Sequence, residues 1–241
     1  MPVTANLSVH DVVRDRLVRC VFQPVVTFAT GEIFAYEALA RPTAERYRED
    51  PQLLFEEAAK VGMVGELGRM MRGMAIEGCP NHPLLINVAP HEFDEGWLVQ
   101  PNDPIFQHNH AVFLEITESV PLAYFAQCHN VLAEIRGKGL GLAVDDLGAG
   151  YSNLKYISDL HPEIVKLDRQ LIAGIRAESR QFKLASGIVR LCVDMGAKVV
   201  IEGIETRDEL AAAAATGAHY GQGFLIARPS FPPPTPQWPP K

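Results

Sequence analysis

The sequence predicts an α/β protein folded as a TIM-like (β/α)₈ barrel. From residue 83 onward, short apolar runs alternate with longer segments of helical period. These runs are almost continuously apolar, which is typical of parallel strands with helices covering both faces of the sheet. Eight candidate strands with interleaved helices, in one domain of this size, favour a closed barrel over an open sheet.

The N-terminal part begins differently from the rest. Ser8 is placed to cap a short helix over residues 9–18. Residues 18–28 and 31–41 are two predicted strands joined by a turn at "ATG", which indicates an antiparallel hairpin. Residues 51–78 have a helical pattern that we expect to divide in two near Gly62 and Gly65.

The regular alternation follows that helix. We expect strands over residues 83–89, 111–117, 140–146, 164–168, 198–205 and 219–229. We expect an irregular helix after residue 89, and helices over residues 122–139, 151–160, 178–196 and 206–217. The proline-dense tail predicts disorder. The predicted organisation is an N-terminal helix and linker over residues 1–17, a barrel over 18–230 and a disordered tail over 231–241.

The bulk composition limits the classes of function. The chain has 241 residues, 47% of them hydrophobic, and a formal net charge of -7, which does not favour a nucleic-acid polymer as partner. The four cysteines have no CxxC spacing, so we expect free thiols in a reducing compartment. There is no signal-like N-terminus and no apolar run of the ~20 residues that a membrane span needs. We therefore expect a cytoplasmic protein without membrane insertion.

Polar residues recur where the predicted strands end, which is where parallel barrels place their active sites. Taken singly, each is more simply a helix cap, a turn residue, a solvated carboxylate or a lysine stem along the surface. Chance becomes a weaker explanation when a polar residue ends one predicted strand after another. The residues concerned are Glu37, Asn87, Glu115, Asp145, Asp146, Lys166, Glu202 and Gln222.

The adjacent Asp145 and Asp146 indicate a cation site, because buried carboxylates that converge without a cation are severely destabilising. Oxygen donors suit Mg²⁺ or Mn²⁺ and argue against zinc held by thiolates. Adjacent aspartates can serve two ions ~3.5–4 Å apart, as in two-metal phosphoryl displacement. Gly148 and Gly150 would let the following loop fold tightly beside the ions.

Seven motifs in one order then resemble a known family: "EALAR", "NVA", "EITE", "DDLGAGYSNL", "VKLD", "EGIE" and "GQGF". The chain is similar to the EAL family of cyclic di-GMP phosphodiesterases from "FQPVV" to "GQGFLIARP". The resemblance implies a barrel whose first strand is antiparallel to the others, which agrees with the hairpin. It also implies hydrolysis of cyclic di-GMP to linear pGpG with two Mg²⁺ or Mn²⁺ ions, by in-line attack of water.

The resemblance further implies roles for single residues. The expected metal ligands are Glu37, Asn87, Glu115, Asp145, Asp146 and Glu202, with Asp145 bridging the two ions. The expected catalytic residues are Lys166, which orients or activates the attacking water, Glu202 and Glu37. Whether Glu202 binds metal or serves as the base is left open. The expected substrate-binding residues are Gln23, Leu39, Arg41 and Gln222. Supporting roles fall to Glu118, which holds the "DDLGAG" loop, and to Glu205.

Arg41 is expected at a substrate phosphate, because the donor fork of a guanidinium fits phosphate oxygens. Two departures from the family pattern lie in the loop, where Leu147 and Ala149 replace a phenylalanine and a threonine. The lost hydroxyl removes one possible loop anchor, worth roughly 1 kcal/mol. Ala89 also stands where a serine is common. None of these three changes removes a ligand, so we expect them to affect only the magnitude of activity.

Three alternatives stay open at the level of sequence. The chain could be a cyclic di-GMP receptor that has lost turnover. It could be an unrelated barrel enzyme in which strand-end acids hold Mg²⁺ and a lysine removes a proton, as in enolase-like proteins. It could also be a barrel with chance surface acids.

We further expect inhibition by Ca²⁺, whose looser coordination would misplace the water. We also expect a homodimer that works with a sensor domain or partner protein.

Overall fold

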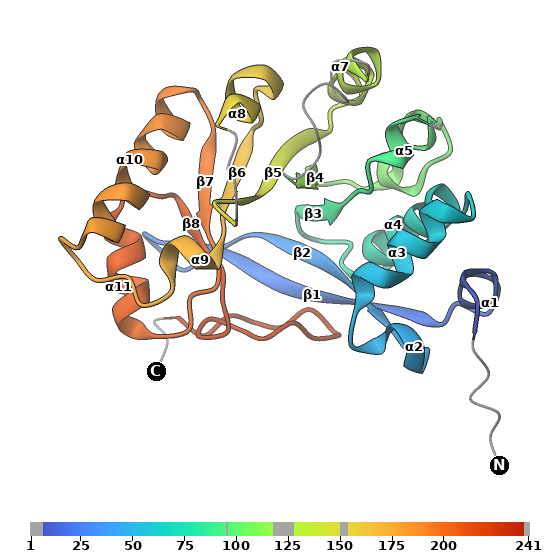
Figure 1. Cartoon of the computed structure of the whole chain (residues 1–241), viewed down its shortest axis with the longest axis horizontal. Helices are drawn as coiled ribbons and strands as arrows, with labels where there is room; N and C mark the ends of the chain where they lie inside the picture. The colour runs from blue at the N-terminus through green and yellow to red at the C-terminus, as the bar shows by residue number, and fades with distance from the viewer. Residues whose placement is uncertain (1–6, 95, 118–127, 150–153, 239–241) are drawn as a thin grey trace.

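The computed structural model describes residues 7–94, 96–117, 128–149 and 154–238, and in them eight strands form a closed barrel in sequence order (Figure 1). β1 is antiparallel to both of its neighbours, β2 and β8, and the remaining pairs are parallel. The predicted fold class, with its antiparallel first strand, is confirmed. The strands are β1 Val18–Thr27, β2 Ile33–Pro42, β3 Leu84–Asn87, β4 Val112–Thr117, β5 Gly141–Leu147, β6 Ile164–Leu167, β7 Lys198–Ile201 and β8 Tyr220–Gly221.

Helices flank the barrel except along the β1–β2 hairpin (Figure 1), and short-range capping explains how the first of them starts. Ser8 and Asp11 form the capping box of the first helix. The predicted break in the long helical segment occurs at Gly62, whose φ of 72° is left-handed, whereas Gly65 lies inside α4. The α-helices are α1 Val9–Arg14, α2 Glu45–Arg48, α3 Pro51–Lys60, α4 Val64–Gly78, α5 His91–Asp94, α7 His129–Gly137, α8 Lys155–Leu160, α9 Arg169–Ile172, α10 Arg180–Asp194 and α11 Arg207–Ala215, and the 3₁₀ helices are η1 Trp97–Val99 and η2 Pro104–Gln107.

The last strand is much shorter than predicted. The chain leaves the sheet at Gly223, where a Cβ atom would lie only 2.1 Å from the carbonyl oxygen of Ile204. The backbone N–H groups of Leu225 and Ile226 then donate to Ile204 and Gly223 instead of extending the β1 ladder. The short helix α9 was also not expected from the sequence.

The proline-rich tail, whose composition predicts disorder, lies against the barrel as far as residue 238. The Tyr36 hydroxyl donates to the Pro234 carbonyl at 2.9 Å, and the Trp238 ring occupies the space beside Gly31. No helix separates β1 from β2, so the outer side of this hairpin needs another cover over Phe22 and Tyr36, which are 0% and 3% exposed. Prolines suit this position because they bring no N–H donors that need partners. Residues 239–241 lie outside the described residues.

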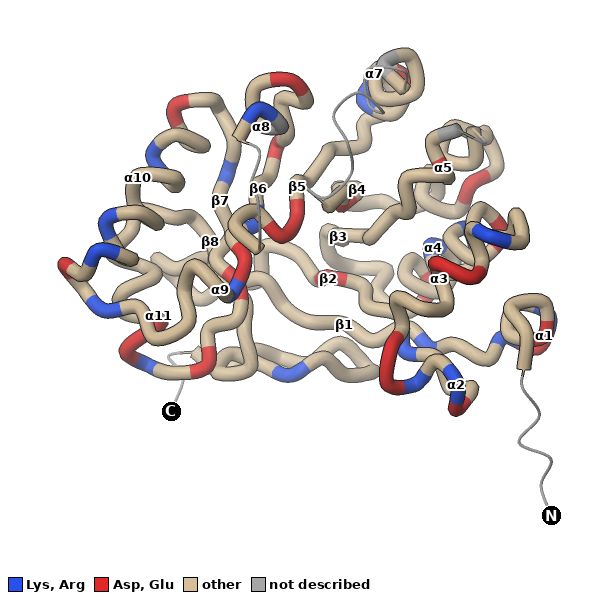
Figure 2. The backbone as a smooth tube through the Cα atoms, in the orientation of Figure 1, with Lys and Arg blue, Asp and Glu red and all other residues tan. Residues whose placement is uncertain are grey.

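Helix α1 is likewise part of the packed structure, because Val9 and Val12 are buried in the core cluster shared with β1, β2 and α4. A second cluster fills the space between β6, β7 and the helices α10 and α11. None of the helices in the described ranges is long and apolar enough to cross a membrane. Figure 2 shows charges of both signs along the outer helices α10 and α11, and an acidic segment at the end of β5 near the middle of the molecule.

Candidate active site

A layer of apolar side chains closes the inside of the barrel, and it sets the height of the polar residues. This layer contains Val25, Ala35, Leu85, Ala143, Ile164 and Val200, with Phe113 and Tyr220 packed against it. Side chains on a strand alternate, so the second residue after each layer position points inward again, about 6.6 Å higher. That second residue is polar on β2 to β6 and directly after β7 and β8: Glu37, Asn87, Glu115, Asp145, Lys166, Glu202 and Gln222. On β1, which runs the other way, Gln23 precedes Val25 by two.

Asp145 and Asp146 can both reach the mouth of the barrel because β5 is irregular at this point. The pairing of β5 with β6 shifts by one residue between Val144 and Leu147, which is the signature of a β-bulge. Without it, adjacent residues would point to opposite faces, and bulges are a common means of redirecting side chains beside active sites. Asp146 has a left-handed φ of 59°, and its N–H donates to the Asp145 carboxylate at 3.0 Å.

The loop that follows needs a glycine at Gly148. Its φ is 107°, and a Cβ atom there would lie 2.2 Å from the Leu171 side chain. The sequence predicted that this glycine lets the loop fold tightly. Gly150 and the remainder of the loop up to residue 153 lie outside the described residues.

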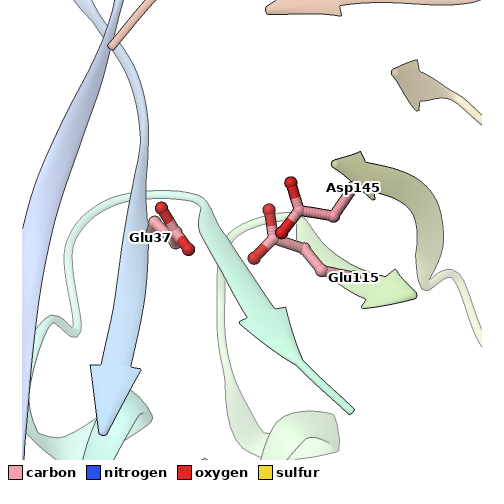
Figure 3. A group of neighbouring side chains, drawn as sticks. All are labelled: Glu37, Glu115 and Asp145. Carbon is pink, nitrogen blue, oxygen red and sulfur yellow. The ribbon is translucent and has the colours of Figure 1, made fainter. Parts of the chain in front are cut away.

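The acidic side chains form two overlapping groups with Asp145 in common. Glu37, Glu115 and Asp145 point toward one another (Figure 3), and each offers a carboxylate oxygen within 4.8 Å of the others. Asp145, Asp146 and Glu202 form the second group by the same measure. Six predicted ligands therefore converge, once Asn87 is added, and Asp145 belongs to both groups.

Lys166 is the central cation of this cluster and is 1% exposed. Its Nζ lies 2.7 Å from Glu202, 2.8 Å from Glu115, 3.0 Å from Asp145 and 3.6 Å from Glu37. Carboxylates thus outnumber the ammonium four to one, even before Asp146 is counted. This excess of buried negative charge is what divalent cations would offset.

The electrostatics of the cluster appear in its pKa values. Burial raises the pKa of Glu115 well above its ordinary range, although Lys166 acts in the opposite direction. Burial likewise raises the pKa of Glu202, again against the influence of Lys166. Burial alone would lower the pKa of Lys166, but Asp145, Glu115, Glu202 and Glu37 together raise it well above its ordinary value. Without cations, the folded protein holds its protons in this cluster tightly.

Three amides line the same space. Asn87 Nδ2 donates to Glu115 at 3.2 Å and to Glu37 at 3.4 Å, so a half-turn of the planar amide would present its oxygen in the same place. Gln222 Nε2 donates to Glu37 at 2.6 Å and to Gln23 at 3.1 Å. Among the described residues, the buried Gln222 Oε1 has no hydrogen-bond partner. An orphaned acceptor beside four carboxylates fits a site that accommodates a cation or a hydrogen-bond donor.

The donor set therefore fits hard divalent ions: carboxylate and amide oxygens, with no thiolate and no imidazole among the described members of these groups. Most of these residues, though not Asn87 or Glu115, line a cavity of about 290 Å³. Its lining consists of Gln23, Glu37, Leu39, Asp145, Asp146, Lys166, Arg169, Glu202, Gly203, Glu205, Gln222, Gly223 and Phe224.

The remaining predicted residues are placed as follows. Leu39 and Glu205 line the cavity, and Glu205 pairs with Arg169 at 2.6 Å. Arg41 is exposed and donates to the carbonyl oxygen of Ala40 at 2.8 Å; it is not among the residues that line the cavity. Glu118 lies outside the described residues.

Arg169 and Phe224 also line the cavity and were not predicted from the sequence. Arg169 directly follows the motif "VKLD", and Phe224 is the last residue of the motif "GQGF". The Phe224 ring is 45% exposed and lies 4.3 Å from the Arg228 guanidinium carbon. An aromatic residue at the end of a motif that already contained Gln222 was the signal that could have identified it.

Known proteins resemble this chain in both sequence and fold. The sequence model of the EAL domain family matches residues 8–229, a range that includes helix α1. The cyclic di-GMP phosphodiesterase PA2567 of Pseudomonas aeruginosa is 31% identical over 236 residues, covering 90% of this chain. The chain spans 39% of the length of that relative.

Two solved structures are similar in fold. Klebsiella pneumoniae BlrP1 in complex with manganese and cyclic di-GMP has a TM-score of 0.77 at 28% identity, covering 91% of this chain and 57% of that one. The PaMucR phosphodiesterase in complex with cyclic di-GMP has a TM-score of 0.80 at 25% identity, covering 92% of this chain and 95% of that one.

Proposed function

The chain belongs to the EAL domain family, and we propose that it hydrolyses cyclic di-GMP to linear pGpG with the help of two divalent cations. The observation that carries this proposal is the pair of acidic groups that share Asp145 around the buried Lys166. The relatives named for this reaction support the choice of substrate. The chain covers only part of PA2567. A homodimer and a sensor partner are included in the proposal.

The residues present would divide two ions between them. Glu37, Asn87, Glu115 and Asp145 would hold one ion, and Asp145, Asp146 and Glu202 the other. When bound, such ions lower the pKa of water and neutralise charge on phosphoryl oxygens. Mg²⁺ or Mn²⁺ would suit these oxygen ligands.

The side chains of the protein would supply positioning. The Lys166 ammonium lies 2.7–3.0 Å from three of the acids, which keep it protonated, and as a hydrogen-bond donor it would orient the attacking water toward the phosphorus. Gln222 holds Glu37 in place through its 2.6 Å hydrogen bond, and so keeps the carboxylate directed at the centre of the mouth. The buried layer below closes the barrel, which excludes water from that side.

The cavity would receive one phosphodiester and its neighbouring nucleoside. Leu39 lies on the lining as an apolar surface for the nucleotide, and Gln23 offers amide donors and acceptors for a base. Arg41 would turn from the Ala40 carbonyl to a substrate phosphate, for which its planar donor fork is suited. A half-exposed Phe224 at the rim adds a further flat apolar surface.

The test is chromatography of cyclic di-GMP after incubation with the protein and Mn²⁺ or Mg²⁺. We expect linear pGpG to appear, to be abolished by EDTA and by the Glu115→Gln variant, and to be suppressed when Ca²⁺ replaces Mn²⁺ because its larger coordination sphere misplaces the water. Binding of cyclic di-GMP with no product over hours would instead identify a receptor. Absence of both binding and product would return the enolase-like alternative.

A further inference from the structure

The structure buries a second charged cluster, outside the mouth of the barrel, which the reaction does not use directly. This Arg72 triad consists of Arg72 on α4, Glu92 on α5 and Asp103 at the start of η2, with side chains 0%, 1% and 0% exposed. Arg72 Nε lies 3.1 and 3.0 Å from the two Asp103 oxygens, and its Nη2 lies 2.7 Å from Asp103 Oδ2. Arg72 Nη1 donates to Glu92 Oε2.

Glu92 connects this triad to the end of β3, where Asn87 lies. Its other oxygen, Oε1, accepts the backbone N–H of Ala89 at 3.0 Å, and Ala89 is two residues beyond Asn87. Between them, the N–H of Val88 donates to the Glu115 carbonyl oxygen at 3.1 Å. The segment that carries Asn87 is therefore held to β4 at one residue and to Glu92 at the next.

The packing around Glu92 is specific to its carboxylate. A Cβ atom at Gly68 on α4 would lie 2.1 Å from Glu92 Oε2, so the glycine leaves the space that the carboxylate fills. The Ala89 and Glu92 backbones are also joined, since the Glu92 N–H donates to the Ala89 carbonyl at 3.0 Å. The Glu92 side chain thus has one direction available, with Arg72 on one oxygen and Ala89 on the other.

A buried ionic triad is weak evidence for stability alone, because well-packed apolar residues often replace such groups without loss. What directional hydrogen bonds add is a fixed geometry. Here the fixed geometry ends at the backbone beside Asn87, whose amide faces Glu37 and Glu115 at 3.4 and 3.2 Å.

We propose that Glu92, oriented by Arg72, is a positioning residue that holds Asn87 toward the Glu37–Glu115 pair and so determines how tightly that pair binds a divalent cation. This inference rests on the cation site of the proposed function. It concerns cation affinity alone. It can therefore hold even if the chain does not hydrolyse cyclic di-GMP.

The test measures Mn²⁺ binding without substrate, from the EPR signal of free Mn²⁺ in titrations of the full chain. Glu92→Met removes the acceptor for Ala89, and we expect Mn²⁺ affinity to fall by roughly 10–100-fold, the usual effect of losing a group that orients a ligand. Glu92→Gln keeps an acceptor oxygen for Ala89, and we expect it to restore affinity to within about threefold. The matched control is Asp103→Asn, which alters the same triad at the end remote from Asn87 and should change affinity by less than about threefold.

A second variant keeps the test decisive if Glu92→Met does not fold. Arg72→Met, Glu92→Met and Asp103→Asn together leave no charge in the triad. The amide oxygen that Asp103→Asn introduces can still accept the Ile105 N–H, which the Asp103 carboxylate accepts at 3.1 Å. We expect this triple variant to fold and to bind Mn²⁺ as weakly as Glu92→Met.

Several outcomes would overturn the inference: unchanged affinity in Glu92→Met or in the triple variant, an equal loss in Asp103→Asn, or no Mn²⁺ binding by the unaltered chain. If the unaltered chain binds Mn²⁺ but yields no pGpG, the proposed function fails. The role of Glu92 is then still decided by the affinities of its variants.

Discussion

The described residues contain two buried charge clusters, and these are built on opposite principles. In the Arg72 triad, both oxygens of each carboxylate accept hydrogen bonds, from Arg72 or from backbone N–H groups. At the mouth of the barrel, four carboxylates crowd one ammonium, and the neighbouring Gln222 Oε1 has no partner among the described residues. A satisfied cluster serves structure, whereas an unsatisfied one with excess charge is suited to bind a ligand.

The two cations match these purposes. The planar guanidinium of Arg72 distributes directed donors to two fixed segments, which joins α4, α5 and η2. The ammonium of Lys166 is a compact charge that contacts several acids without fixing one geometry. Arrangements around Lys166 can therefore change when cations and substrate enter, while those around Arg72 cannot.

The largest expected difference between the clusters concerns turnover. Lys166→Met removes the donor at the centre of the mouth, and we expect kcat for cyclic di-GMP to fall about 10³-fold, within the range for a positioned proton-handling side chain. The control is Lys198→Met, an exposed lysine at the start of β7. Turnover of Lys166→Met within tenfold of the unaltered chain, measured by chromatography of pGpG, would remove Lys166 from the mechanism.

The next difference concerns stability in the absence of cations. Asp103→Asn weakens a complete buried ion pair, and we expect it to lower the free energy of unfolding by about 3 kcal/mol. Burial raises the pKa of Glu115 and so favours its neutral form, and Glu115→Gln then exchanges one neutral polar group for another, so we expect a change below about 1 kcal/mol. Urea unfolding in EDTA measures both, and equal losses would contradict the distinction between the clusters.

The sequence predicted the mouth of the barrel far better than the triad. Each strand-end residue follows an apolar run in the sequence, so Glu37, Asn87, Glu115 and Lys166 could be assigned to one height before their contacts were known. What could not be foreseen was the β-bulge that brings Asp145 and Asp146 to the same side, because a bulge depends on the pairing of β5 with β6.

The Arg72 triad was not predicted because its members carry no local signal. Arg72 lies in a helical pattern where an arginine is ordinarily solvated, and Asp103 is 31 residues further along the chain. The position of the proline-rich tail also could not be predicted from local sequence. Its composition indicates disorder, yet a hairpin without a covering helix offers it a surface, and only the three-dimensional arrangement shows that Tyr36 needs a partner there.

The smallest expected difference concerns pH. Burial raises the pKa of Glu115 above the ordinary value of 4.5, so the folded state binds this proton more tightly than the unfolded state. Its contribution to stability is therefore complete below pH 4.5 and is lost as pH rises through the raised pKa of the folded state, at no more than about 1.4 kcal/mol per pH unit.

The Glu115→Gln variant has no carboxyl group at this position and so does not lose a proton there. In EDTA, its stability relative to the unaltered chain should therefore increase as pH rises from 5 to 8. Saturating Mn²⁺ should flatten the pH dependence of the unaltered chain, because cations take the place of the protons at the mouth. The Arg72 triad supplies the contrast. Burial also raises the pKa of Glu92, but no cation site adjoins its carboxylate among the described residues, so Mn²⁺ should leave that contribution unchanged. Melting curves across pH with EDTA or Mn²⁺ measure both, and a pH dependence unaffected by Mn²⁺ would mean that the excess protons lie elsewhere than the mouth.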